Sequence, residues 1–401
     1  MAIVRGKQDR RRAWPSYGQT RSSRGVGIIQ ANKIVAQRGH RSGQTRSLLG
    51  VSIVQANKIA AGMAILRDKR DRRWAFLLIN RLDKRRLTSM RYVAGLDGGG
   101  TKTAVTVAEE SGRVVHRFTA GPLNLNGQDE ASVKATLHEI AANVGHVCEG
   151  GLAACVAMAV GAAGISNPTV SGRLTEGLRE GGFAGRLVLV GDHETALWGA
   201  HEGPHGMILI AGTGSIAYGR NADGTVHRAG GFGHLIDDEG SGYSIGRDLL
   251  SAVVRASDGR EAPTVVTELV YARLGLSTVQ ELVGFVYAKE RNKADIAALA
   301  PLLSVACEVG DASALRIAER NALALVDTAS AVAEALGLAE SGELALLGSV
   351  LLQSSQVRAT FEAGMAARHP RLRCIDARRD AAHGAMLLAL SELRGVSAVR
   401  E

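Results

Sequence analysis

Two strand–turn–strand segments with glycine at the turn constrain the fold of this 401-residue chain most. They are VAGLDGGGTKTAV at residues 93–105 and MILIAGTGSIAYG at residues 207–219. Glycine destabilises a strand, so several glycines between two strands indicate a structural or functional requirement for glycine at that turn. The first turn is not a Walker A loop, because Thr101 precedes Lys102 and the residues that follow alternate as in a strand. Each segment leads into a third extended run, so each opens a β-meander.

The elements that follow the two meanders repeat one order. We expect a helix, a buried strand, a helix and a strand after the first meander, at residues 129–147, 155–164, 167–180 and 186–192. A long helical stretch from about 242 to 336 follows the second meander, before a strand at 344–349, a helix, a strand at 371–376 and a last helix at 381–393. The pattern predicts a duplicated α/β fold with lobes at 91–204 and 205–401, a ligand cleft between the lobes, and a last helix that returns to the first lobe.

The first 90 residues differ from the rest in charge and in repetition. They hold 21 Lys and Arg against four Asp, whereas residues 91–401 carry more acidic than basic side chains. Residues 18–36 recur at 43–61 with 14 of 19 positions identical. We interpret residues 1–90 as a basic extension, disordered or upstream of a true start at Met90. The alternative is an arm that binds nucleic acid, because clustered Lys and Arg neutralise phosphates.

The cysteines and the hydropathy pattern indicate a cytoplasmic protein with no membrane span. Cys148, Cys155, Cys307 and Cys374 have no C-x-x-C spacing, which is typical of reduced thiols and excludes a cysteine-rich zinc loop. No apolar run approaches the length of a bilayer-spanning helix.

Paired glycine turns can bind a polyphosphate between exposed backbone N–H groups. Asp97 precedes the first glycines at a strand end, where a carboxylate suits Mg²⁺. At Gly214 we expect a phosphate to contact the backbone. A β-branched side chain there would fill the space of the phosphate and would resist any positive φ. Lys102 is a candidate phosphate contact or an exposed turn residue.

Six stretches resemble the BadF/BcrA-type ATPase family of the actin-like ATPase and sugar-kinase superfamily, in which N-acetylglucosamine and glucosamine kinases are the nearest match. They are GLDGGGTKT, GPLNLNG, VGDHETALWGAH, LIAGTGSIAYGRNADG, GGFGHLIDDEGSGYSIGRDLL and DAAHGAMLLAL, spread over residues 91–401. The resemblance implies a two-lobe, ribonuclease-H-like fold that binds ATP and Mg²⁺. LLGSV departs from the two adjacent glycines common at the adenosine turn.

The resemblance also implies roles for individual residues. Asp192 matches the catalytic base of the sugar kinases, although an aspartate before a helix can also be its N-cap. Asn124, Asp238 and Gly231 match sugar-contacting positions. The ATP-binding positions are Gly98, Gly99, Gly100, Thr101, Lys102, Gly212, Thr213, Gly214, Ser215 and Gly348, and the metal-binding position is Asp97. His193 and His234 are interpreted as hydrogen-bonding residues in preference to metal ligands.

The predicted function is ATP-dependent phosphorylation of an amino sugar, first N-acetylglucosamine to its 6-phosphate, by a homodimer. Glucosamine and muramic-type sugars stay open as substrates. The alternative from another class is a dehydratase activator or other ATPase, which would need cysteine ligands for an iron–sulfur cluster. Only Cys148 stands beside glycines, so this alternative is disfavoured.

Overall fold

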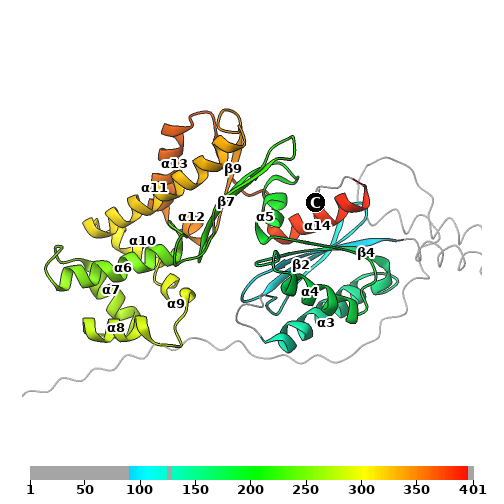
Figure 1. The fold of residues 1–401 in the computed structure, drawn as a ribbon, viewed down its shortest axis with the longest axis horizontal. Coiled ribbons are helices and arrows are strands. Elements are labelled where there is room, and N and C mark those ends of the chain that lie inside the picture. The colour runs from blue at the N-terminus through cyan, green and yellow to red at the C-terminus, as the bar shows by residue number, and fades with distance from the viewer. Residues whose placement is uncertain (1–89, 124–128, 396–401) are drawn as a thin grey trace, which may run out of the picture. The chain divides into compact units, whose positions relative to one another are not determined.

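The computed structural model describes residues 90–123 and 129–395, in which two five-stranded mixed sheets are each covered by helices (Figure 1). The predicted duplicated α/β fold is therefore confirmed. The predicted extension before Met90 and the predicted sugar contact Asn124 lie outside the described residues.

The first sheet has the strand order β3-β2-β1-β4-β5. Its central strand β1 pairs antiparallel with β2 and parallel with β4, so a hairpin meander continues into a crossover arrangement. Both faces of the sheet are covered: α3 and α4 pack on one face, and α14 and α5 pack on the other. The elements are β1 Tyr92–Gly98, β2 Thr103–Glu109, β3 Val114–Ala120, α3 Glu130–Val147, η1 Leu152–Ala154, β4 Cys155–Ala162, α4 Pro168–Glu180, β5 Arg186–Val190 and α5 Asp192–His201.

The second sheet repeats this arrangement with the order β10-β9-β6-β7-β8. The β6–β7–β8 meander pairs antiparallel, and β9 joins β6 in parallel. The predicted long helical stretch is a series of separate helices, of which α6 and α11 pack on one face of the sheet. The elements are β6 Gly206–Ala211, β7 Ser215–Arg220, β8 Val226–Gly230, α6 Gly242–Ser257, α7 Val265–Leu274, α8 Val279–Tyr287, α9 Lys293–Ala297, α10 Pro301–Glu308, α11 Ala312–Ala335, β9 Glu343–Leu347, α12 Ser349–Gln353, α13 Ser355–Arg368, β10 Arg373–Asp376 and α14 Ala381–Leu393.

Glycines allow α5 and α14 to approach each other without intervening side chains. A Cβ on Gly199 of α5 would lie 2.2 Å from the carbonyl oxygen of Asp380, and a Cβ on Gly384 of α14 would lie 2.0 Å from that of Thr195. A Cβ on Gly95 of β1 would likewise meet the backbone of α14. Because backbone cannot yield as a flexible side chain can, these contacts require glycine. They hold α5, and hence Asp192 at its start, against the first sheet.

Candidate active site

The turn between β1 and β2 is closed by its own backbone. The N–H of Gly99 donates to the carbonyl of Lys102 at 3.1 Å, and the N–H of Leu123 donates to the carbonyl of Gly99 at 3.3 Å. Gly98 is buried, whereas Gly100, Thr101 and Lys102 are exposed. The predicted phosphate-binding residues of this turn are thus open to a ligand at its tip.

Asp97 is the last acidic residue before this turn, and its charge interacts with those of Asp192 and Asp380. Burial raises the pKa of Asp97 to about 6, with further contributions from the charges of Asp192 and Asp380. A carboxyl group that is costly to ionise suits a divalent cation, because the charge of the cation would stabilise the ionised form. The described residues contain no group of three or more His, Cys, Asp and Glu side chains placed to hold a metal ion. The assignment of Mg²⁺ to Asp97 stays a prediction, in which water and phosphate oxygens would be the other ligands.

Asp192 is the first residue of α5, directly after β5 and Gly191. The N-cap position falls on Gly191, which has no side chain, so the alternative interpretation of Asp192 as the N-cap residue is wrong. The Asp192 carboxylate accepts a hydrogen bond from the backbone N–H of His193 at 3.0 Å. The His193 Nδ1 lies 3.5 Å from the same carboxylate oxygen. The carboxylate side chain is 52% exposed.

The pKa of Asp192 is shifted in the opposite direction from that of Asp97. Burial acts to raise the pKa of Asp192, but the hydrogen bonds and the charge of His193 outweigh it and leave this pKa below the ordinary value. His193 is held in turn by an edge-on contact with Tyr218, their ring centroids 4.5 Å apart. Asp192 is therefore ionised at neutral pH and can accept a proton, and His193 is a hydrogen-bonding residue as predicted.

The turn between β6 and β7 is fixed onto the start of α6. The N–H groups of Gly242 and Tyr243 donate to the carbonyls of Gly212 and Thr213, at 2.7 and 3.3 Å. The Ser215 hydroxyl donates to the carbonyl of Glu239 at 2.6 Å. Because the carbonyls of this turn are bonded on the α6 side, the turn has one fixed orientation.

Gly214 has a second reason to be glycine besides the predicted space for a phosphate, which stays a prediction. Its φ is not positive. A Cβ at this position would instead lie 3.0 Å from the carboxylate of Asp238. Asp238 is 3% exposed and has a positive φ of 67°. The structure thus places this predicted sugar contact directly against the predicted phosphate turn.

The predicted sugar-binding segment around Gly231 is ordered by hydrogen bonds within itself. The backbone N–H of Phe232 donates to the Asp237 carboxylate at 2.8 Å, and the N–H of Asp237 donates to the carbonyl of Gly233 at 2.9 Å. Gly231 has a φ of 75°, a conformation that favours glycine. His234 packs edge-on against Tyr243 with ring centroids 4.6 Å apart, and its predicted hydrogen-bonding role stays a prediction.

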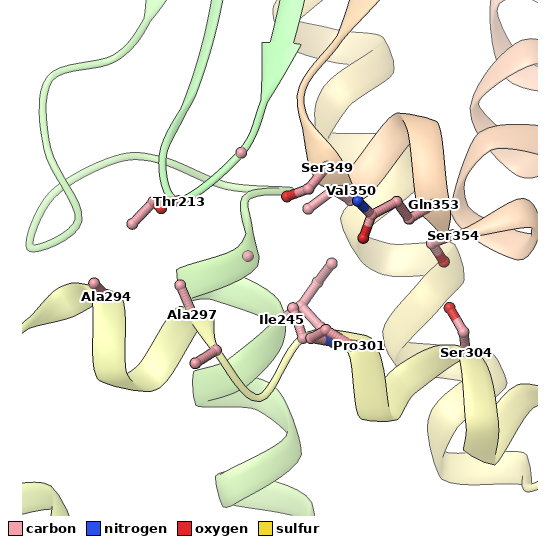
Figure 2. Close-up of a pocket in the computed structure, with 14 residues that line it drawn as sticks. Thr213, Ile245, Ala294, Ala297, Pro301, Ser304, Ser349, Val350, Gln353 and Ser354 are labelled. Carbon is pink, nitrogen blue, oxygen red and sulfur yellow. The ribbon is translucent and has the colours of Figure 1, made fainter. Parts of the chain in front are cut away.

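The third glycine turn opens onto a cavity of about 410 Å³. Gly348 has a φ of 89°, and a Cβ there would lie 2.3 Å from the carbonyl oxygen of Ala211. Figure 2 shows the cavity between the turn that carries Thr213, the start of α12, and helices α9 and α10. It is lined by Gly212, Thr213, Gly242, Ile245, Ala294, Ala297, Ala298, Ala300, Pro301, Ser304, Ser349, Val350, Gln353 and Ser354.

The sequence motifs missed most of this cavity. In Figure 2 the Ser304 and Ser354 hydroxyls point toward each other across one end of it. The buried Ser354 hydroxyl has no hydrogen-bond partner among the described residues, which fits a site that a ligand completes. Of the residues that line or border the cavity, the sequence motifs indicated only Gly348 and the Gly212–Thr213 turn as ligand-binding positions. The small side chains of α9 and α10 read as ordinary helix residues.

The cysteines contribute no site to this arrangement. All four are free, and Cys148 and Cys155 are buried in the core between the first sheet and its helices. In the part of the chain that the structure describes, no helix combines the length and the apolarity needed to cross a bilayer.

A family model described as the BadF/BadG/BcrA/BcrD ATPase family matches residues 94–389. The chain belongs to this family. The resemblance inferred from the six motifs is thereby confirmed. The matched region contains both glycine hairpins, Asp192 and the Gly348 turn, and it ends within α14.

Individual relatives agree with this membership. The chain is 33% identical over 305 residues to an N-acetylmuramic acid/N-acetylglucosamine kinase of Clostridium acetobutylicum, a match that covers 76% of this chain and 99% of the relative. It is 27% identical to an N-acetyl-D-glucosamine kinase of Dictyostelium discoideum, with the same coverage. The crystal structure of a candidate N-acetylglucosamine kinase of Chromobacterium violaceum, 29% identical, superposes with a TM-score of 0.62 and covers 75% of this chain and 99% of that one.

Proposed function

We propose that this chain transfers the γ-phosphoryl group of ATP to a hydroxyl of an N-acetylated amino sugar, with N-acetylglucosamine as the first substrate to test and its 6-phosphate as the product. The observation that carries the proposal is the ionised carboxylate of Asp192 at the exposed start of α5, in a chain whose curated relatives are amino-sugar kinases.

The nucleotide is assigned to the two hairpins and the cavity. The turn at Gly212–Ser215 and the exposed tip at Gly100–Lys102 would contact the phosphates through backbone N–H groups. The 410 Å³ cavity beyond Gly348 would take the adenosine, with the unpartnered Ser354 hydroxyl bonding it. Asp97 would hold Mg²⁺, which when bound neutralises charge on the β- and γ-phosphates.

Asp192 is assigned as the general base. As the sugar oxygen forms its bond to the γ-phosphorus, the bond from phosphorus to the β,γ-bridging oxygen breaks and its electron pair leaves with ADP. The hydroxyl proton passes to the Asp192 carboxylate. A base of low pKa suffices, because the transition state of phosphoryl transfer is loose and the proton leaves late; positioning and electrostatics provide most of the acceleration.

The test is Asp192→Asn. We expect kcat to fall at least ~100-fold, the lower end of what general-base catalysis supplies, while the affinities for sugar and ATP change little. Asp129→Asn is the matched control: Asp129 is the N-cap of α3, with its carboxylate accepting from the Ser132 N–H at 2.9 Å. Near-normal turnover of Asp192→Asn would remove this residue from the mechanism and make Asp238 the next carboxylate to test.

The alternative, an ATPase or activator that phosphorylates no sugar, makes a different prediction. A kinase releases ADP only when the sugar is present, whereas an activator does so without it. The buried positions of Cys148 and Cys155 disfavour a cluster shared with another subunit. A homodimer stays a prediction, to be measured by sedimentation equilibrium.

A further inference from the structure

The second lobe holds a polar cavity of about 370 Å³ that shares no lining residue with the cavity beyond Gly348. It lies between α6 and α11, two helices that pack against each other. Residues seven apart in a helix lie on one face, and each helix presents such a face to the cavity. The polar lining includes Asp248 and Arg255 of α6, Glu261 of the connection to α7, and Ser313, Arg316 and Arg320 of α11.

Two of the three arginines are held in place by one carboxylate. The Arg255 Nε donates to one oxygen of Glu261 at 2.6 Å, and an Nη of Arg316 donates to the other oxygen at 3.1 Å. The same Nη of Arg316 donates to the Ser313 hydroxyl at 3.0 Å. Both guanidiniums are therefore oriented before a ligand arrives, which lowers the entropy that binding costs.

A buried carboxylate holds the third arginine. Asp248 is 7% exposed, and one of its oxygens forms an ion pair with Arg320 and accepts from the Asn321 amide at 2.9 Å. Its other oxygen lies 3.4 Å from an Nη of Arg247. Because Asp248 is fixed between these partners, it anchors Arg320 at the cavity.

The three guanidiniums keep donors that these contacts do not use. Each of them uses a single nitrogen, and its other two nitrogens have no partner within residues 90–123 and 129–395. Both oxygens of each carboxylate, by contrast, are engaged by arginines. Three cations line the cavity beside two anions, so its lining carries a net positive charge. An anion with several acceptor oxygens suits such a set of donors.

Among anions, a phosphate monoester fits this arrangement best. It has three terminal oxygens, one for each guanidinium, and a charge close to −2 at neutral pH. Pockets that bind small organic molecules measure about 300–1,000 Å³, so the cavity has room for more than an inorganic ion. We propose that this cavity binds the phosphate monoester of a small hydroxylated molecule, at a site separate from the proposed active site.

The test is calorimetric titration of the full chain with glucose 6-phosphate, glucose and inorganic phosphate. We expect saturable binding of glucose 6-phosphate with a Kd below about 1 mM, weaker binding of inorganic phosphate and no binding of glucose. Failure of glucose 6-phosphate to bind would overturn the proposal. Equal affinity for inorganic phosphate would overturn the assignment to an ester. The titration involves no turnover, so its outcome is independent of the proposed kinase function.

Arg316→Gln locates the binding. We expect its affinity for glucose 6-phosphate to fall about 10- to 100-fold, as for loss of a charge-assisted hydrogen bond. Glu261 keeps Arg255 in this variant, so no carboxylate is left unpaired. Arg255→Gln is the second variant and should show the same loss, with Glu261 keeping Arg316.

Arg358→Gln is the matched control. Arg358 of α13 also bridges two carboxylates, those of Glu362 and Asp376, and lines no part of this cavity. It should leave the affinity for glucose 6-phosphate unchanged. Undiminished binding by Arg316→Gln would place the ligand elsewhere. ATP affinity should be unaltered in Arg316→Gln, and a matching loss of ATP affinity would assign the ester to the nucleotide site and overturn the proposal.

Discussion

At the scale of single residues, two aspartates close enough to influence each other have opposite pKa shifts. The pKa of Asp97 is raised to about 6 by burial and by the charges of Asp192 and Asp380, whereas that of Asp192 is lowered through His193. Such divergence is how one site obtains groups with different roles. Asp192 can act as a base at neutral pH, while Asp97 is costly to ionise until a cation neutralises it.

The cost of ionising Asp97 predicts a gain in stability on its removal. Because the raised pKa means that the folded state binds more protons, the contribution of Asp97 to stability is fully present below about pH 4 and is lost as pH rises to about 6. Without Mg²⁺, Asp97→Asn should raise the free energy of unfolding at pH 7.5 by about 1–3 kcal/mol and leave it nearly unchanged at pH 4. Urea unfolding at the two pH values measures this. An equal effect at both would refute the electrostatic cause.

At the scale of elements, the glycine turns differ in what their glycines do. A Cβ on Gly348 would meet backbone, so that glycine is structural. A Cβ on Gly212 would meet nothing within 4 Å, although Gly212 lines the cavity. Its missing side chain therefore leaves space that the fold does not use.

Gly212→Ala should consequently fold normally and lose nucleotide affinity. We expect a melting temperature within about 2 °C of the original protein, as for a surface substitution, and an ATP affinity weaker by about tenfold or more. Gly284→Ala in α8, where a Cβ also meets nothing within 4 Å, is the control and should leave ATP binding intact. Calorimetric titration with ATP gives the comparison. Unchanged affinity for Gly212→Ala would move the phosphates away from this turn.

At the scale of the whole molecule, the family match and the relatives account for one continuous part of the chain. The model match begins at residue 94, and alignments that cover 99% of two relatives cover 76% of this chain. The family match does not include the basic residues 1–89, with their internal repeat.

A protein that begins at Met90 should therefore keep full kinase activity and thermal stability. The measurement is kcat and melting temperature beside the full chain. Loss of most of either would mean that residues 1–89 belong to the working protein. Salt-dependent retention on DNA by the full chain alone would support the nucleic-acid-binding interpretation of those residues.

The sequence by itself determined the two meanders, the duplicated α/β fold and the family, because alternation and glycine spacing are local properties that survive without tertiary context. Only the tertiary structure decided how distant residues meet. It placed Asp238 against Gly214, put Gly191 and not Asp192 at the N-cap, and assembled the cavity from α6, α9, α10 and α12. The contact of Tyr218 with His193 depends on strand register and helix packing, since no local pattern records which face of a sheet meets which helix.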